Sequence, residues 1–429
     1  MTTGSDLLDG PVLAKPEQRE AERRVLDLIA DPDIQAMQVE LVGELAATEM
    51  GQTHDGARQL DNAVALWTNS MIFAEVTAYQ PVPAFIWATD NTPRSWFGYE
   101  LPGNGIAGDN PDFIYRRLTV DGEGQFEITG RINLAHRPAQ MTMEVMRGNV
   151  GPMQLKDQSK THVDMGNQVG VIDERSLRVD PDGNFTIQMG GPARSENYIP
   201  LEPGEMTVLV RDVLSDWSQQ PAALSIRRTG GADAPGRDLA ALKRDVLAKL
   251  PEYVRFWGKY HTTWLGGLEP NSYVGPVMRD GGWGYIAGLR FQLAPDEALL
   301  VTTDSGGAGY AGFQLCDNWM ISPDARRHQA SLNLAQAATN PDGTRSYAIT
   351  PVDPGIHNWI DSAGLHNGIA LLRFQAMPPG VNKDDLIREF RVLKLSDLDD
   401  LPLPRVSPDQ RKAQMAMRHS LHAARARES

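Results

Sequence analysis

The chain has 429 residues, of which 41% are hydrophobic and 22% charged. This balance is typical of globular proteins and excludes a mainly disordered chain, and the length predicts two or three domains. The formal net charge is −14. A surplus of acidic groups repels polyanions, which argues against nucleic acid as the main ligand.

The sequence predicts a cytoplasmic location and no membrane partner. No apolar run reaches the roughly 18 residues of a membrane span. The N-terminus lacks a basic segment followed by an apolar run, so we expect no secretory signal. Cys316 is the single cysteine. It cannot form an internal disulfide, and this favours a reducing compartment.

Residues 1–100 form a predicted N-terminal helical segment. Apolar side chains recur at helical spacing in residues 17–30, 34–50 and 60–79. Pro81 and Pro83 then end the helical region.

Residues 101–230 are predicted to form a first β-sandwich domain. Short alternating runs are separated by Asp-Gly, Asn and Pro turns, which is typical of antiparallel hairpins. The expected strands span residues 113–120, 125–132, 141–146, 177–179, 185–189, 206–211 and 223–227.

Residues 238–400 are predicted to form a helical connection and a second β-sandwich. The stretch 230–237 reads as a linker, and residues 238–257 have helical spacing with a break or a new helix at Pro251. The fold class is therefore mainly β with attached helices (α+β), with two antiparallel sandwich or jelly-roll-like domains. Residues 401–429 form a basic tail or a docking helix. The expected strands of this half span residues 285–293, 298–303, 310–317, 332–335, 346–350 and 368–375.

Residues 281–375 carry a more specific pattern, GGWGYIAGLRFQLAPDEALLV, GFQLCDNWM and NPDGTRSYAITPVDPGIHNWIDSAGLHNGIALLRFQ. This resembles the family called domain of unknown function 1214, which often accompanies domain of unknown function 1254. Arg373-Phe374 stands where that family usually has Arg-Trp. The resemblance implies β-sandwich or jelly-roll modules and a substrate class of steroid-like or aromatic compounds. The matching positions are Gln314, Asn318, Trp319, Asp342, Gly343, Asp353, Pro354, Gly355, Asn358, Trp359, Asp361, Gly364 and Arg373.

The first candidate site is the segment 353–373, which gathers His357, Asp361, His366 and Arg373 around Trp359. A histidine can act as a base near neutral pH, a carboxylate can orient it, and an arginine can bind an anion. The alternative is a structural turn in which the aspartates bond to backbone N–H groups. The histidine spacing matches no helical metal motif, so we expect no metal.

The second candidate is the aromatic-rich stretch 257–285, which contains Tyr260, His261, Trp264, Trp283 and Tyr285. Rings with polar ends suit an apolar ligand pocket and suit a domain interface equally well. We expect this stretch and the segment 353–373 to face one cleft.

Two further groups of polar residues stand in predicted strands. Gln314 and Asn318 would lie on one face of a strand, with Trp319 beside them. Buried amides need backbone or ligand partners, and we expect Gln314, Asn318, Trp319 and Trp359 to line the substrate pocket. In the first domain, the Asn110–Asp112 turn and Arg116-Arg117 could reach a shared cleft, or form a turn and a solvated charged pair. No glycine-rich nucleotide motif is present, so we expect no cofactor.

These features predict a cofactor-independent enzyme that uses acid–base chemistry, a lyase or a hydrolase, on a small hydrophobic molecule. In this hypothesis His357 or His261 is the base, Asp361 orients it, Arg373 binds an anionic group, and the aromatic residues line the pocket. The alternative is a non-catalytic sandwich module that binds carbohydrate or a protein partner. The oligomeric state stays open, with a homodimer as one option.

Overall fold

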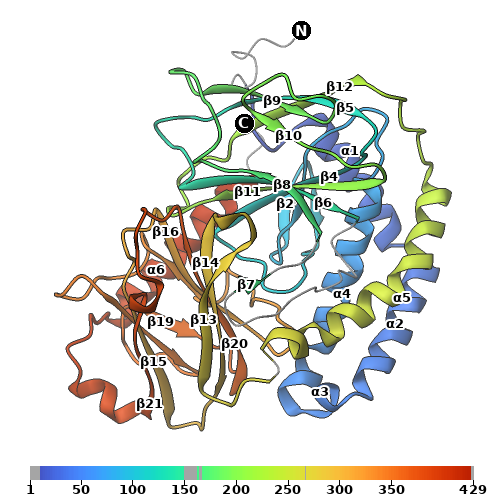
Figure 1. Cartoon of the computed structure of the whole chain (residues 1–429). Coiled ribbons are helices and arrows are strands. Elements are labelled where there is room, and N and C mark those ends of the chain that lie inside the picture. The colour runs from blue at the N-terminus through green and yellow to red at the C-terminus, as the bar shows by residue number, and fades with distance from the viewer. Residues whose placement is uncertain (1–9, 149–161, 164–166, 266, 427–429) are drawn as a thin grey trace.

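The computed structural model describes residues 10–148, 162–163, 167–265 and 267–426. Within these ranges the chain forms two β-sandwiches and a layer of helices that runs along the right-hand side of Figure 1. The predicted fold class, mainly β with attached helices, is confirmed. None of the helices in this part of the chain has both the length and the apolar character that a membrane span needs.

The helical layer starts with four helices, α1 (Pro16–Ile29), α2 (Pro32–Ala46), α3 (Glu49–Gln52) and α4 (His54–Val76). Asp31 begins α2, because its carboxylate accepts the backbone N–H of Asp33 at 3.0 Å. Thr53 begins α4 in the same way through Gly56 N–H. Most of α4 is buried because other helices and the first sandwich surround it.

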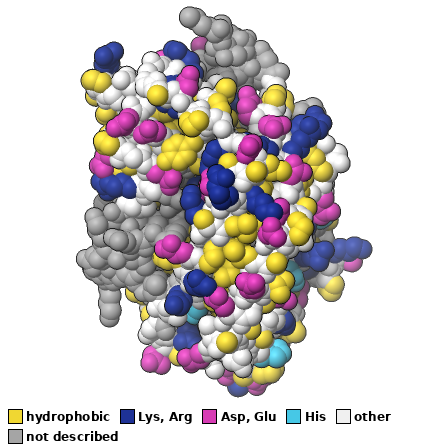
Figure 2. All heavy atoms as spheres, turned by 90° about the vertical axis from the view of Figure 1, so that its right-hand side faces the viewer, with side chains coloured by type: hydrophobic (Ala, Val, Ile, Leu, Met, Phe, Trp, Pro, Cys, Tyr) yellow, Lys and Arg dark blue, Asp and Glu magenta, His cyan; other side chains and the backbone are white. Residues whose placement is uncertain are grey.

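Helix α5 (Leu239–Trp264) completes the layer and continues through Pro251, so the predicted break is wrong. Proline removes one helical hydrogen bond, but Leu250, Val254 and Trp257 pack into the core that α5 shares with α4. The linker before α5 is fixed at its end, where Arg237 donates to a Glu75 carboxylate oxygen at 2.8 Å. Acidic, basic and hydrophobic side chains are interspersed on the helical face of the molecule (Figure 2).

The first sandwich packs a five-stranded sheet on a four-stranded sheet around one apolar core. Strand β1 belongs to this sandwich although the sequence pattern indicated only helices before residue 101, because four residues are too few to show a period. The predicted strand at 177–179 is wrong, and β8 takes its place in the chain. The strand order of the five-stranded sheet is β1 (Ile86–Thr89), β4 (Phe113–Asp121), β11 (Glu205–Val213), β6 (Gln140–Arg147) and β8 (Gln168–Ile172). The strand order of the four-stranded sheet is β10 (Tyr198–Ile199), β9 (Asn184–Met189), β5 (Gln125–Arg131) and β12 (Ala223–Gly230).

The second sandwich packs a six-stranded sheet on a four-stranded sheet. Strands β13 and β21, which the sequence analysis did not identify, extend these two sheets. Most pairings are antiparallel, and β7, β10 and β19 each pair in parallel with one neighbour. The strand order of the six-stranded sheet is β17 (Ser331–Asn333), β16 (Tyr310–Cys316), β20 (Asn367–Gln375), β14 (Gly284–Gln292), β13 (Ser272–Arg279) and β7 (His162–Val163). The strand order of the four-stranded sheet is β19 (Trp359–Asp361), β18 (Arg345–Thr350), β15 (Glu297–Thr303) and β21 (Ile387–Lys394).

Short elements join the larger units. The hairpin of β2 (Arg94–Trp96) and β3 (Tyr99–Leu101) follows β1, and the 3-10 turns are η1 (Asp280–Gly282), η2 (Lys383–Asp385), η3 (Leu395–Asp400) and η4 (Ala424–Ala426). The basic C-terminal segment forms helix α6 (Pro408–Ala423), in which Arg411, Arg418 and His422 are buried. Of the two expectations for this segment, a basic tail or a docking helix, the described residues agree with the docking helix.

Candidate functional site

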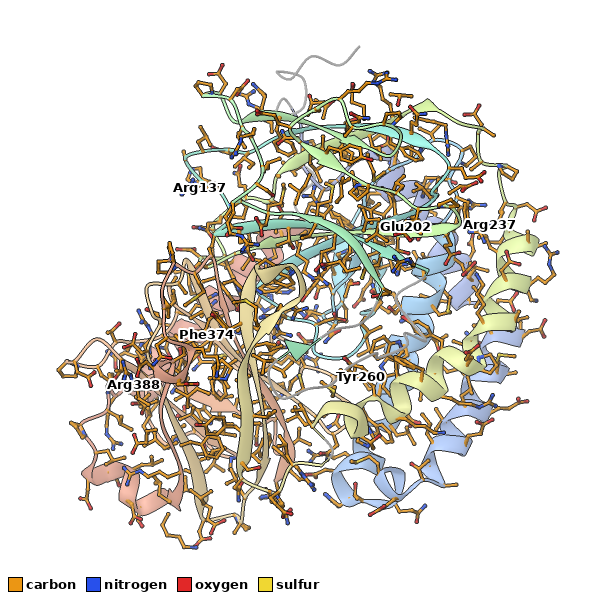
Figure 3. The ribbon with its side chains drawn as sticks, viewed as in Figure 1. Arg137, Glu202, Arg237, Tyr260, Phe374 and Arg388 are labelled. Carbon is orange, nitrogen blue, oxygen red and sulfur yellow. The ribbon has the colours of Figure 1, made fainter. Side chains whose placement is uncertain are left out.

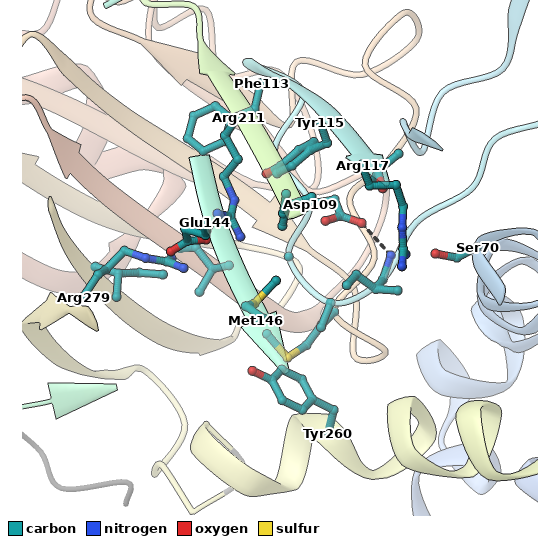
Figure 4. A pocket seen from close by; sticks show the side chains of 18 of the residues that line it. Ser70, Asp109, Phe113, Tyr115, Arg117, Glu144, Met146, Arg211, Tyr260 and Arg279 are labelled. Carbon is teal, nitrogen blue, oxygen red and sulfur yellow. Dashed lines mark hydrogen bonds and ion pairs between the residues drawn. The ribbon is translucent and has the colours of Figure 1, made fainter. Parts of the chain in front are cut away.

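A cavity of about 180 Å³ lies where the two sandwiches meet the helical layer (Figure 4). Its wall is formed by the five-stranded sheet of the first sandwich, the six-stranded sheet of the second, helices α4 and α5, and residues 106–109. Much of this wall is apolar or aromatic, through Ile106, Phe113, Met146, Leu209, Trp257, Ile286, Met320 and Leu371.

The two sheets that border the cavity are buried on both faces, which explains the mixed sequence pattern of their strands. Successive side chains of a strand point to opposite faces. On β4, Leu118 packs in the sandwich core, whereas Tyr115 and Arg117 line the cavity. On β20, Leu372 packs in the other core and Arg373 lines the cavity. Every second residue of these strands therefore contributes to one site.

Asp109 is the carboxylic acid of the loop that enters the cavity. One of its carboxylate oxygens accepts the backbone N–H of Ile106 at 2.5 Å. Burial raises the pKa of Asp109 to about 6, although that hydrogen bond and the positive charges of Arg373 and Arg211 oppose the shift. A carboxyl group with a pKa near neutrality can both give and accept a proton.

The Asp109 loop is held by residues of the second sandwich. Gln314 donates to the main-chain carbonyl of Asp109 at 2.5 Å, and Arg373 donates to that of Gly108 at 2.5 Å. Gly108 has a positive φ of 70°, and a Cβ atom there would lie 2.6 Å from Leu371. Only glycine therefore fits this approach of the loop to β20.

Tyrosine hydroxyls form the neutral polar part of the wall. Burial raises the pKa of Tyr115 to about 12, and the nearby Asp109 charge adds to that shift. Its hydroxyl oxygen accepts the backbone N–H of Asn110 at 3.0 Å. Burial also raises the pKa of Tyr253 and of Tyr260. These hydroxyls stay protonated at neutral pH. The Tyr253 hydroxyl donates to Ser70 Oγ at 3.3 Å, and the Tyr115 hydroxyl can donate to a ligand.

Charged side chains reach the cavity from five strands. Arg117 comes from β4, Arg211 from β11, Arg279 from β13 and Arg373 from β20. Glu144, on β6, forms an ion pair with Arg211. The sequence analysis selected Arg373 and considered Arg117, but it missed Asp109, Tyr115, Glu144, Arg211 and Arg279. Charged residues inside apolar strand runs, as at Glu144 and Arg211, are the signal that could have identified them.

Several residues that the sequence analysis selected do meet at this cavity. Tyr260, Trp283 and Arg373 line it, and Gln314 lies directly behind Arg373, to which it is hydrogen bonded. Figure 3 shows Tyr260 on the side of α5 that faces the space between the sandwiches. Trp283 donates from its indole nitrogen to Glu144 at 3.0 Å. Tyr260 and Trp283 of the stretch 257–285 and Arg373 of the segment 353–373 thus share one cavity.

Three selected residues lie behind the wall. His261 packs edge-on against Trp319 with 5.8 Å between ring centroids, and burial lowers the pKa of His261 to about 4. Trp319 donates to the Gly56 carbonyl at 2.9 Å and belongs to the helical core. Asn318 is buried, and its amide nitrogen has no hydrogen-bond partner in the described structure. None of the three lines the cavity, so their predicted placement in its wall is wrong.

Tyr285 and Trp264 also differ from their predicted positions. Tyr285 packs against the core of the second sandwich, whereas its neighbour Ile286 lines the cavity. The alternation of β14 places the two residues on opposite faces. Trp264 is the last residue of α5, and its side chain lies outside the described part of the chain.

The other half of the segment 353–373 lies away from the cavity, which corrects the prediction of a single cleft. Trp359 and Asp361 are on β19 in the outer sheet, whereas Arg373 is on β20 in the inner sheet. The chain crosses between the two sheets of the sandwich after Asp361. The core of the sandwich therefore separates these residues from Arg373.

The side chains near β19 have structural partners instead. The imidazole of His357 contacts the amide of Gln414 on α6 at 2.8 Å. Asp361 pairs with His328 at 2.7 Å, and Trp359 donates to the Thr350 carbonyl at 3.1 Å. The alternative interpretation of this stretch as a structural turn therefore agrees with the contacts of His357 and Asp361.

The described residues contain no group of three or more His, Cys, Asp or Glu side chains arranged to hold a metal ion. The absence of a metal or cofactor requirement stays a prediction.

No protein-family model and no curated protein sequence matches this chain. A crystal structure of an uncharacterized protein from Burkholderia cenocepacia matches with a TM-score of 0.62 and 22% identity, over 88% of this chain and 99% of that chain. A protein from Vibrio parahaemolyticus matches with a TM-score of 0.38 and 10% identity, over 67% of this chain and 90% of that chain. The first similarity supports the fold alone. The resemblance to domain of unknown function 1214 stays a prediction.

Proposed function

We propose that the chain is an enzyme that carries out acid–base chemistry on a small, largely apolar molecule bound in the central cavity. One observation carries this proposal: Asp109, with a pKa raised to about 6, lies in the wall of a cavity that is otherwise largely apolar and aromatic. Perturbed carboxyl groups in such cavities are typical of general acids and bases.

Each wall group has a role in the proposed reaction. Asp109 takes a proton from the substrate or gives one to it, and the Tyr115 hydroxyl donates a hydrogen bond to an oxygen on which negative charge develops. Arg373 keeps its predicted role as a binding residue. His357, His261 and Asp361 are replaced by Asp109 as the acid–base group, because none of them lines the cavity. The reaction class proposed is a lyase or a hydrolase.

The alternative proposal is a non-catalytic module that binds carbohydrate or a protein. Such a module would need a shallow platform of exposed aromatic rings. Among the described large hydrophobic residues that are exposed, Tyr273 is the one aromatic side chain. The rings of Tyr253, Trp257 and Trp283 are buried around the cavity instead. This distribution supports the enzyme proposal.

We also propose a cytoplasmic location, which rests on the single cysteine. Cys316 is free and buried in the structure.

The decisive experiment compares wild type with Asp109→Asn. A mixture of small aromatic and alicyclic compounds is incubated with the protein, and mass spectrometry follows which compounds are consumed. For a consumed compound, Asp109→Asn should lower turnover by about 10²- to 10⁴-fold with little change in binding. Asp182→Asn, at an exposed turn, is the control and should turn over normally. Wild-type turnover by Asp109→Asn would reject the proposed role of this residue.

A further inference from the structure

The central cavity has a surplus of positive charge. Among its described lining residues, four guanidinium groups face two carboxylates, those of Glu144 and Asp109. Even with Arg117 left out of this balance, three guanidinium groups face these two carboxylates, so at least one positive charge has no carboxylate on the wall. Charges withdrawn from water are costly unless they are paired, so a site of this kind is stabilised by an anion.

Three of these arginines differ in how they are held. Arg373 is fixed by Gln314 and by the Gly108 carbonyl, and Arg211 is paired with Glu144. The guanidinium group of Arg279 has no hydrogen-bond acceptor among the described residues, and its Nε atom is buried without a partner. Arg279 is thus the cation with the most unused hydrogen-bonding capacity among these three.

Glu144 does not supply the missing acceptor for Arg279. Its carboxylate already accepts from Trp283 at 3.0 Å and from Gln168 at 2.9 Å, in addition to Arg211. Figure 4 shows the ends of Arg211 and Arg279 converging near Glu144. Arg279 is instead held by the Trp283 ring, whose centroid lies 4.3 Å from its guanidinium carbon.

The rest of the wall limits the shape of a ligand. Phe113, Ile286 and Leu371 give apolar contacts on one side, and Trp257 and Tyr260 on the helical side. An apolar cavity of roughly 150 Å³ can hold one benzene ring. A volume of about 180 Å³ therefore suits one ring or a short branched chain with a small head group.

We propose that the ligand of the central cavity is a small carboxylic acid with an apolar or aromatic body, and that Arg279 binds its carboxylate. The planar guanidinium can donate two parallel hydrogen bonds to a carboxylate. The inference rests on the proposed function only in using the same cavity, and it holds whether or not the bound acid is turned over.

Benzoate and cyclohexanecarboxylate are the probes, and benzamide and benzyl alcohol are their uncharged counterparts. Thermal melting and isothermal titration calorimetry of the full chain measure binding. The carboxylates should raise the melting temperature, and the uncharged compounds should bind about 10- to 100-fold more weakly, the effect of losing hydrogen bonds between charged groups.

Arg279→Met tests the residue, because methionine keeps an apolar stem and removes the charge. Its dissociation constant for benzoate should rise about 10- to 100-fold. Arg228→Met is the matched control. Arg228 is also stacked on a ring, with its guanidinium carbon 4.6 Å from the centroid of Phe126, and it lies outside the cavity. Since Arg279→Met removes a buried charge, the variant should fold, which its melting curve without ligand checks.

Equal binding of benzoate and benzamide, or unchanged benzoate binding by Arg279→Met, would overturn the proposal. Benzoate binding without turnover of any carboxylate would reject the enzyme proposal and leave this one standing. If wild type and Arg279→Met turned over uncharged compounds at equal rates, the enzyme proposal would stand and the proposal that Arg279 binds a carboxylate would be rejected.

Discussion

The hydroxyl of Tyr310, on β16 of the second sandwich, donates a 2.7 Å hydrogen bond to Asp112, which precedes β4 of the first sandwich. The same carboxylate accepts from Trp217 at 2.6 Å and from Asn333 at 3.0 Å. Asp112 is completely buried. A single carboxylate therefore joins the two halves of the molecule.

Asp112→Ala should lower the free energy of unfolding by about 3–5 kcal/mol, because it leaves three buried donors without their acceptor. Urea-induced unfolding of wild type and variant measures the difference. Asp182→Ala, at an exposed turn, should change it by less than about 0.5 kcal/mol. An unchanged urea midpoint for Asp112→Ala would show that the junction does not depend on this carboxylate.

Asp109 should make stability depend on pH. Its pKa in the folded protein, about 6, is above the ordinary aspartate value of 3.8. The folded protein therefore binds the proton more tightly, and this contribution to stability is complete below about pH 4 and is lost as the pH rises through 6. Asp109→Asn should be more stable than wild type by about 1–3 kcal/mol at pH 7 and equal to it near pH 4.

Urea unfolding of both proteins at several pH values between 4 and 7 tests the Asp109 prediction. Ser218→Ala, at an exposed position without a titratable group, is the control, and its difference from wild type should stay constant with pH. A constant difference for Asp109→Asn as well would mean that the carboxyl has an ordinary pKa.

Cys316 should be unreactive in the folded protein. The thiol is completely buried, and burial raises its pKa to about 12. The thiolate is the reactive form, so alkylation needs local or global opening. Iodoacetamide labelling followed by mass spectrometry should show slow modification of native protein and rapid modification in denaturant. Ser218→Cys, at an exposed position, should label rapidly in the native state. Fast labelling of native Cys316 would contradict this burial.

His328 should lose its raised pKa when its partner is changed. Its hydrogen bond to Asp361 is the main cause of that shift. A raised histidine pKa gives stability that is present below the unfolded value of about 6.5 and is lost as the pH rises through the folded value. Asp361→Asn should therefore lower the His328 pKa, and it should destabilise the protein more at pH 5.5 than at pH 8.5.

An NMR titration of the His328 ring signals measures its pKa in both proteins, and thermal melting at the two pH values measures the stability. Benzoate binding should be unchanged in Asp361→Asn, because Asp361 does not line the cavity. An unchanged His328 titration would reject the importance of the pair. Lost benzoate binding would return Asp361 to the candidate site.

The sequence predicted the sandwiches because Asp-Gly turns and alternating strands are local signals. It could not predict the site equally well, because the wall residues come from well-separated parts of the chain, from Ser70 to Arg373. His357, Asp361 and Arg373 are close in sequence, but β19 and β20 belong to different sheets. The chain passes from one sheet to the other between Asp361 and Arg373, so residues that are close in sequence here do not form a cluster in space.

The periodicity of the strands contained more information than the sequence analysis used. Residues 113–120 gave a mixed pattern because both faces of β4 are buried. A charged pair such as Arg116-Arg117 in such a run then needs two different buried partners. Arg116 pairs with Asp212 at 2.5 Å, and Arg117 lines the cavity. Buried arginines in adjacent positions thus indicate that both sides of a strand are covered.

The loop that carries Gly108 and Asp109 leads into β4 of the first sandwich and is hydrogen bonded to residues of the second half, and this links the unfolding of the two sandwiches. Gly108 donates its backbone N–H to the Met320 carbonyl at 2.8 Å and accepts from Arg373. Separating the sandwiches would break these bonds and expose both cavity-lining sheets to water. Calorimetry of the full chain should therefore show a single heat-absorption peak with equal van't Hoff and calorimetric enthalpies, although the molecule contains two cores that each look complete.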